Sequence, residues 1–490
     1  MKHNILYIAL AAGVLLTSSC TDFLTEAPKL DQSDELTLSN YNGLNLSTAG
    51  AYSPLASGNW YAQDMIMINE LKTLNGKKLI GTEYDTGRFT SHYQVNWNAN
   101  NTTSLWGTAY YTITSASEVI DHLGNAEGES GVSEQDIKNL EAECRFIRAL
   151  AHFDLVRTYA QPYCYTSDAS HLGVPVILHK DPSGNPARNT VKEVYDAVIE
   201  DLLTAESLID PEYRRADVKD ETATVTVYAI QALLARVYLY SEQWQNAADY
   251  ATKVINSEKF KLWTAKDFED PEATPYTEDT HKIDGTDEVI FEVYGKITNA
   301  YDGYWDGLAN NCAPGSYGDA GATDQLIDIF EEGDARGNLF VDDSYGSKTA
   351  EGAYWSSKYL GKGDGVPDAT NVIVLRLAEM YLIRAEAVAL HGATSEVSAI
   401  DDLKAIAERM GATAPNATAS GIASERNKEF NWEGHLWFDL GRTKTDMTRT
   451  DETKTGVITS ITWGSKYFAM PIPYSQVKVS NGVLVQNEGY

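Results

Sequence analysis

Two stretches of the chain carry the apolar spacing of a helix, a turn and a second helix, and this pattern limits the fold more than any other feature. In residues 223–255, apolar side chains recur every three or four positions in each half, as expected when one face of each helix is buried. A second stretch, from Val372 to Met410, has the same design. We therefore expect two helix pairs. The small residues on their apolar faces are Ala232, Ala235, Ala247, Ala251, Ala378, Ala385, Ala387 and Ala399.

Other segments are predicted to extend this helical frame. Ser133 and Asp136 have the spacing of a capping box, and the apolar positions that follow predict a long helix ending near Pro162. A further apolar stripe covers 191–208. Alanines at helix crossings beside a bulky aromatic such as Trp244 resemble the tetratricopeptide repeat, in which helix pairs stack into an array. The expected fold class is mainly α, with a tetratricopeptide-repeat-like helical scaffold.

Two regions depart from this helical period. Residues 58–101 and 261–370 are rich in Gly, Asp, Asn and aromatic residues, and the second holds one clear strand, Glu288 to Tyr294. Long irregular insertions in a regular scaffold usually carry function. We expect partly β loop insertions that form one composite binding face. The predicted organisation is a single domain over 46–490, with its helical frame at about 105–260 and 370–445.

The N-terminus has the pattern of a secretory signal. Lys2 precedes an apolar run from Ile5 to Leu16, which is shorter than the ~20 residues that a membrane-spanning helix needs. Cys20 then follows Leu-Leu-Thr-Ser-Ser and resembles the modified cysteine of a bacterial lipobox. Residues 1–19 are thus predicted as a signal peptide and 20–45 as a lipidated tether. An ordinary signal peptide with a chance cysteine is the alternative.

Charge and cysteine content exclude several classes of protein. The formal net charge of −31 disfavours nucleic acid, whose phosphates need a basic surface. The three later cysteines, Cys144, Cys164 and Cys312, are too few and too scattered for a disulfide framework or a zinc site. We expect each to be a small buried side chain.

A series of residues along nearly the whole chain resembles the SusD/RagB family of outer-membrane nutrient-binding lipoproteins. The matching positions occur in the family's order and are densest near the C-terminus. They are Trp106, Tyr110, Glu143, Arg145, Phe146, Arg148, Phe153, Asp154, Tyr195, Asp201, Ala235, Arg236, Arg376, Glu379, Glu386, Glu425, Arg426, Glu429, Phe430, Glu433, Gly434, His435, Trp437, Asp439, Arg442, Pro471, Pro473, Gln486, Asn487, Gly489 and Tyr490.

The resemblance implies a surface lipoprotein that captures oligosaccharides and passes them to a SusC-like TonB-dependent transporter in the outer membrane. It implies a cell-surface location, a lipid anchor and no enzymatic activity. We expect no cofactor and no metal-binding site residue, and the sequence leaves open whether a structural metal is bound. Most matching residues have a structural interpretation, since Glu433 or Asp439 with Arg442 would hold helix and loop ends together.

Local chemistry selects the candidate glycan-binding residues. Sugars offer apolar ring faces and polar edges, so their sites combine aromatic planes with amide, carboxylate or guanidinium groups. Both irregular regions supply these types. For each aromatic residue, burial as a loop anchor is the alternative. The candidates are Trp97, Trp305, Tyr301, Tyr304, Trp60, Asn101 and Arg88.

Two other functions are weighed against glycan capture. A glycoside hydrolase needs a positioned carboxylate pair, and the 70 acidic residues make chance pairs unavoidable. The chain has no Gly-x-Ser-x-Gly elbow, no His-Glu-x-x-His helix and no Gly-rich phosphate loop. A tetratricopeptide-type scaffold that binds a protein or peptide fits the helices but leaves the two aromatic-rich regions unexplained.

Overall fold

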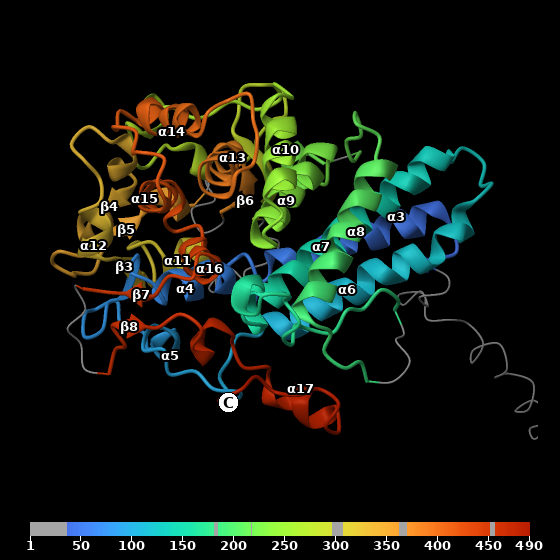
Figure 1. The fold of residues 1–490 in the computed structure, drawn as a ribbon, viewed down its shortest axis with the longest axis horizontal. Coiled ribbons are helices and arrows are strands. Elements are labelled where there is room, and N and C mark those ends of the chain that lie inside the picture. Colours follow the sequence, from blue (N-terminus) through green and yellow to red (C-terminus); the bar gives the residue numbers. More distant parts are fainter. Residues whose placement is uncertain (1–36, 181–184, 217, 296–306, 362–369, 451–455) are drawn as a thin grey trace, which may run out of the picture.

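The computed structural model describes residues 37–180, 185–216, 218–295, 307–361, 370–450 and 456–490. One half of the helical frame consists of α6 (Leu105–His122), α7 (Glu134–Tyr159) and α8 (Val191–Leu208), with α7 lying against both others (Figure 1). The predicted capping box starts α7: Ser133 and Asp136 exchange hydrogen bonds across the first turn. The predictions of a long helix after Ser133 and of a helix over 191–208 are confirmed.

The two helix pairs predicted from the sequence form the other half of the frame. The first pair is α9 (Val227–Tyr240) and α10 (Trp244–Ile255), and the second is α13 (Leu377–His391) and α14 (Ala399–Ala407). Helix α10 packs against both α9 and α13, and Ala247, Ala251 and Ala385 are fully buried. The predicted mainly α, tetratricopeptide-like fold class is confirmed. Shorter helices surround this frame: α3 (Tyr41–Tyr52), α4 (Asp64–Leu71), α5 (Thr90–Tyr93), α11 (Leu308–Asn311), α12 (Asp324–Ile327), α15 (Ala419–Phe430), α16 (Leu436–Arg442) and α17 (Tyr474–Val479).

The strands of the described residues form two-stranded antiparallel sheets. β2 (Val289–Val293) confirms the predicted strand and pairs with β6 (Val372–Arg376). This pairing corrects the prediction that the second helix pair begins at Val372. The β-branched run favours a strand, and the helix begins only at Leu377. The other pairs are β1 (Gly76–Lys78) with β3 (Ala320–Ala322), β4 (Phe340–Val341) with β5 (Trp355–Ser356), and β7 (Met447–Thr448) with β8 (Ser460–Ile461).

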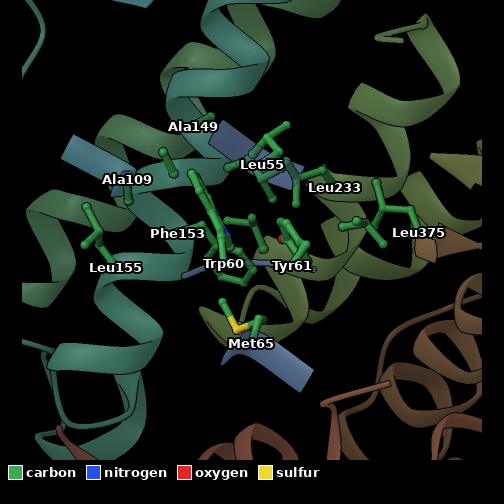
Figure 2. Packing of buried hydrophobic residues seen from close by; sticks show 14 of the residues in the cluster. Leu55, Trp60, Tyr61, Met65, Ala109, Ala149, Phe153, Leu155, Leu233 and Leu375 are labelled. Carbon is green, nitrogen blue, oxygen red and sulfur yellow. The ribbon is translucent and has the colours of Figure 1, made fainter. Parts of the chain in front are cut away.

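The main core lies where the segment before α4 enters the helical frame. Figure 2 shows Trp60 and Tyr61 inserted beside Phe153 of α7 and Leu233 of α9. Asp154 accepts a hydrogen bond from Trp60 Nε1 at 2.8 Å and from the Tyr61 hydroxyl at 2.7 Å. A buried carboxylate thereby anchors this N-terminal segment to α7.

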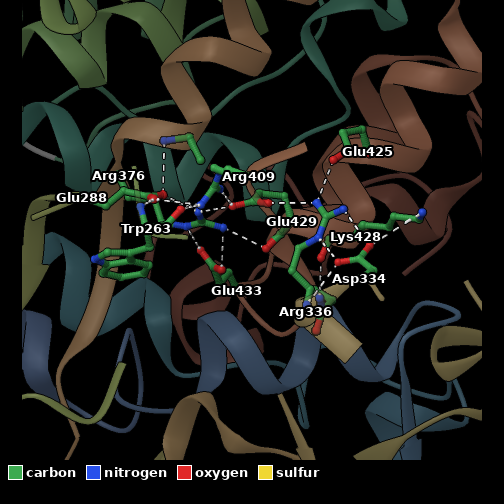
Figure 3. A network of polar contacts seen from close by, with 12 residues as sticks. Trp263, Glu288, Asp334, Arg336, Arg376, Arg409, Glu425, Lys428, Glu429 and Glu433 are labelled. Atoms are coloured by element: carbon green, nitrogen blue, oxygen red, sulfur yellow. Dashed lines mark hydrogen bonds and ion pairs between the residues drawn. The ribbon is translucent and has the colours of Figure 1, made fainter. Parts of the chain in front are cut away.

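A buried network of charged side chains joins the second helical half to the strands. Figure 3 shows Arg376, at the end of β6, between three carboxylates. Its guanidinium lies 2.7 Å from both Glu288 and Glu429 and 2.9 Å from Glu433. Burial raises the pKa of Glu429, but the charges of Arg409, Arg376 and Arg336 outweigh it and hold that pKa below its usual range. The predicted pair of Asp439 with Arg442 is confirmed at 2.7 Å, whereas Glu433 pairs with Arg376 and Lys358.

A buried histidine makes the stability depend on pH. The side chain of His281 is 1% exposed, and its Nδ1 lies 2.7 Å from Asp287. Burial lowers the pKa of His281, but the hydrogen bond to Asp287 and the nearby charges of Glu292 and Asp287 raise it to about 9. A folded-state pKa above the unfolded value of about 6.5 means that folding favours the protonated ring. This contribution is complete below pH 6.5 and is lost as the pH rises through 9.

We therefore expect the stability difference between the native protein and His281→Gln to be largest near pH 6 and to shrink as the pH approaches 9.5. Denaturant unfolding at several pH values measures this difference. The matched control is His179→Gln, because the side chain of His179 is 77% exposed. A His281→Gln difference that stays constant from pH 6 to pH 9.5 would contradict the assignment.

Candidate functional site

The two irregular regions meet on one side of the helical frame. Strands β1 and β3 pair antiparallel, with Gly76 opposite Ala322 and Lys78 opposite Ala320. Beyond this pair, the buried Tyr84 ring lies 4.8 Å from the Trp355 ring. The chain thus brings residues 84–88 beside residues 311–319, and we call this surface the loop face.

Buried polar contacts fix the base of the loop face. Lys78 Nζ is fully buried and lies 2.9 Å from Asp85 and 3.1 Å from Asp319. Asp319 also accepts hydrogen bonds from the Thr86 amide and hydroxyl. Donation of a hydrogen bond by Lys78 lowers the pKa of Asp85. The turn that carries Arg88 is therefore attached to the second region by charge-assisted hydrogen bonds.

Arg88 connects the two regions at the surface. Its guanidinium carbon lies 4.1 Å from the centre of the Tyr317 ring, within the range of a cation–π contact. Its Nη1 lies 3.4 Å from the Asn311 amide oxygen. The sequence pattern marks Arg88 but not Tyr317, because a single tyrosine between Ser316 and Gly318 carries no signal that it packs against a residue more than 200 positions away.

The backbone beside α5 is strained. Phe89 and Val95, on either side of this helix, adopt φ values of 55°. Left-handed backbone is rare for a residue with a bulky or β-branched side chain. Such conformations persist only where surrounding structure imposes them, and they cluster at ligand sites. Nothing in the sequence pattern marks these two positions.

Two predicted aromatic platforms are buried, and this corrects the sequence analysis. Trp60 is 0% and Trp97 is 4% exposed, and both belong to the main core. Trp97 Nε1 donates to the Tyr490 hydroxyl at 3.0 Å, and its ring meets Tyr467 edge-on at 5.8 Å. The prediction that these rings offer an open face to a ligand is wrong, because irregular segments can also lay aromatic side chains on the core beneath them.

The remaining candidates have different positions. Asn101 is exposed, and its side-chain oxygen accepts a hydrogen bond from the Asn98 amide within one turn. Tyr301, Tyr304 and Trp305 lie outside the described residues. Arg88 and Asn101 therefore remain predicted ligand contacts, and so do Tyr301, Tyr304 and Trp305.

Two cavities lie away from the predicted residues. One, of about 740 Å³, is bounded by the ends of α10 and α13 and by α15 and α16. Its wall includes Trp244, which stacks on His391 at 3.6 Å. The second, of about 520 Å³, lies between residues 161–172, Arg188 and the C-terminal residues 464–489. We call it the C-terminal cavity. Both volumes fall in the range of small-molecule sites.

The described cysteines meet a further expectation. Cys144, Cys164 and Cys312 are free and buried, as predicted. Burial raises the pKa of the Cys144 thiol to about 12, so this side chain is an unreactive core residue at neutral pH. In the parts of the chain that the structure describes, no helix combines the length and the apolarity needed to cross a bilayer.

Comparisons with known proteins agree with this architecture. A family model described as "Starch-binding associating with outer membrane" matches residues 22–239, and a model of the SusD family matches residues 342–490. The chain is 25% identical to SusD-like protein P2 of Formosa agariphila, covering 90% of this chain and 91% of that protein. It is also 25% identical to a SusD-like protein of Bacteroides ovatus, with 90% and 82% covered.

A solved structure extends the likeness to three dimensions. The crystal structure of a SusD superfamily protein from Bacteroides vulgatus is 26% identical in sequence and superposes with a TM-score of 0.79. The match covers 92% of this chain and 99% of that one. With two family models on separate parts of the sequence and one fold over nearly all of it, the chain belongs to the SusD/RagB family.

Proposed function

We propose that this protein captures oligosaccharides at the cell surface and delivers them to a SusC-like, TonB-dependent outer-membrane transporter, without acting as an enzyme. The observation that carries the proposal is the match of residues 22–239 to the family described as starch-binding and associated with the outer membrane. A tethered receptor beside its transporter needs only modest affinity, because the tether keeps the effective concentration of ligand high.

The chemistry of the loop face supports a sugar as ligand. Arg88 lies over the Tyr317 ring, which places a fork of hydrogen-bond donors beside an aromatic plane. Sugar hydroxyls accept hydrogen bonds from guanidinium groups, and the apolar faces of sugar rings stack on aromatic side chains. The two regions that supply Arg88 and Tyr317 are joined by β1 and β3, so the site is held in shape before ligand arrives.

Replacing Arg88 with Ala tests this face. We expect at least a fivefold loss of affinity for the oligosaccharide that the native protein binds best, because one charged donor group is removed. Calorimetric titration measures the affinity. The matched control is Arg214→Ala. The Arg214 side chain is 25% exposed and lies 3.7 Å from Glu221 on another part of the surface. Equal affinities for Arg88→Ala and the native protein would place the site elsewhere.

Anchoring is tested at Cys20. Because the residue follows a lipobox-like sequence, we expect the Cys20→Ala variant to be absent from the membrane fraction of cells that lack the transporter. Membrane fractionation and surface labelling with an antibody measure its location. Retention of Cys20→Ala in the membrane fraction at the native level would contradict lipidation.

Delivery requires a partner barrel. We expect an affinity-tagged version of the protein, extracted from outer membranes in mild detergent, to copurify with a TonB-dependent barrel. Mass spectrometry of the purified complex identifies the partner. Recovery of the tagged protein without any TonB-dependent barrel would contradict delivery, while leaving glycan binding intact.

A further inference from the structure

The C-terminal cavity holds an arginine without an acidic partner. Arg188 donates from Nε to the Gly173 carbonyl at 2.6 Å, from Nη2 to Leu172 at 2.9 Å and from Nη1 to Val485 at 3.1 Å. All of these acceptors are neutral carbonyl oxygens. Among the described residues no carboxylate lies within ion-pair distance of Arg188, so its charge has no acidic partner beside the cavity that it lines.

This arrangement differs from that of most buried arginines in the described parts of the chain. The chain has 70 acidic and 39 basic residues, so a carboxylate partner is easily supplied. Several arginines that are more deeply buried than Arg188 have a carboxylate within 3.0 Å. These include Arg148 with Asp201, Arg236 with Glu379, Arg336 with Glu425, Arg376 with Glu433 and Arg384 with Asp402. Burial without a counter-charge lowers the pKa of Arg188 to about 10.

Lys466 adds a second cation to the same cavity. Its ammonium donates to the Gly489 carbonyl at 3.0 Å and lies 4.6 Å from the centre of the Tyr490 ring. The acidic residue of the lining is Glu488, which is exposed. The side chains around the cavity therefore carry a net positive charge on a protein whose formal net charge is −31. A local excess of positive charge attracts an anionic group.

An aromatic side chain lies at the same cavity. Tyr165 is 41% exposed, and its ring meets that of His171 at 5.3 Å in an edge-on contact. Gly464, at φ 77°, lies next to the Tyr165 ring: a Cβ there would be 3.6 Å from Cε2. A larger side chain at this position would contact the Tyr165 ring, which also packs against the Trp463 ring at 6.1 Å. The cavity thus combines two cations with an accessible ring within about 520 Å³.

We infer that the C-terminal cavity binds an anionic sugar residue of a glycan, with Arg188 and Lys466 facing its acidic group and Tyr165 contacting the ring. The inference rests on the proposed glycan-binding function and narrows it to acidic glycans. A uronate carboxylate and a sulfate ester share this chemistry, because both present oxygen acceptors with negative charge.

Three probes separate the sources of charge: a galacturonic acid trimer, a galactose trimer bearing 6-O-sulfate and the unmodified galactose trimer. We expect the purified mature protein to bind at least one charged trimer ten or more times more tightly than the neutral one. Adding 0.5 M NaCl should reduce that preference, because salt screens the attraction. Which charged trimer binds more tightly identifies the anion.

Two substitutions locate the binding. Lys466→Glu is expected to weaken binding of the preferred charged trimer at least tenfold, and Tyr165→Ala at least threefold. The matched control is Lys404→Glu. Lys404 is exposed on α14, and replacing it with Glu changes the net charge by the same amount as Lys466→Glu. Arg188 donates hydrogen bonds to several backbone carbonyls, so Arg188→Gln can also destabilise the fold. The glycan affinity of this variant is therefore interpreted together with its melting temperature. The Lys466 and Tyr165 variants carry the test.

Equal affinity for charged and neutral trimers would overturn the inference. So would an unchanged affinity in Lys466→Glu. If either result is found while neutral glycans bind at the loop face, the inference about the C-terminal cavity is wrong but the proposed glycan-binding function is not contradicted. Failure of the proposed function has a different signature, because then no oligosaccharide of any charge binds.

Discussion

Arg376→Met is expected to lower the free energy of unfolding by about 3–5 kcal/mol, the usual cost of removing one partner from a buried ion pair. Its guanidinium is 2% exposed and lies between Glu288, Glu429 and Glu433. Methionine fills a similar volume but leaves these buried carboxylates without their shared cation. Because they come from the residue before β2, from α15 and from the turn after α15, the loss should loosen the contact between strand and helix.

The matched control for this change is Lys192→Met. Lys192 and Asp196 form an exposed pair on α8, with both side chains more than half exposed. Exposed pairs of this kind contribute little to stability, because solvent screens their attraction. The denaturant midpoint and the melting temperature of both variants measure the contrast. Similar midpoints for the two variants would show that the network contributes little to stability.

Trp60→Ala is expected to cost about 3–5 kcal/mol, the range for removing a large aromatic side chain from a packed core. Trp60 is 0% exposed and stacks on Tyr61 with ring centres 5.7 Å apart. The substitution opens a cavity beside Phe153 and removes one of the hydrogen bonds to the buried Asp154. Glycan affinity should be unchanged in the fraction of protein that remains folded.

A second substitution separates volume from hydrogen bonding. Trp60→Phe keeps much of the ring volume and leaves Asp154 with the Tyr61 hydroxyl and Arg157 as partners, so it should cost less than Trp60→Ala. Tyr111→Ala is the surface control, because Tyr111 is 65% exposed, and should change stability by at most about 0.5 kcal/mol. If Trp60→Ala had the same melting temperature as the native protein but no longer bound glycan, Trp60 would be a ligand contact and not a core residue.

Helical periodicity predicted the frame because its helices have one buried and one exposed face. Helix α8 has this pattern, with Val194, Val198 and Leu202 buried on one side. Helix α4 was missed because every residue from Met65 to Leu71 is buried, so no period distinguishes one face from another. The strand β6 was included in a helix pair because its apolar run continues directly into α13.

Long-range pairing was harder to predict than local pairing. Asp439 and Arg442 lie three residues apart in α16, so their ion pair followed from sequence spacing. Glu433 instead contacts Arg376, 57 positions earlier, and such contacts depend on the whole fold. The same limit applies to the loop face. The sequence supplied Arg88 and the idea that two irregular regions meet, but the partner Tyr317 emerged only from the pairing of β1 with β3.

Binding of the purified mature protein to an array of immobilised oligosaccharides tests the central claim most directly. We expect concentration-dependent binding to a related set of glycans, competed by the same sugar in solution and weakened in Arg88→Ala but not in Arg214→Ala. A folded protein that binds no glycan on a broad array would contradict a role in glycan capture.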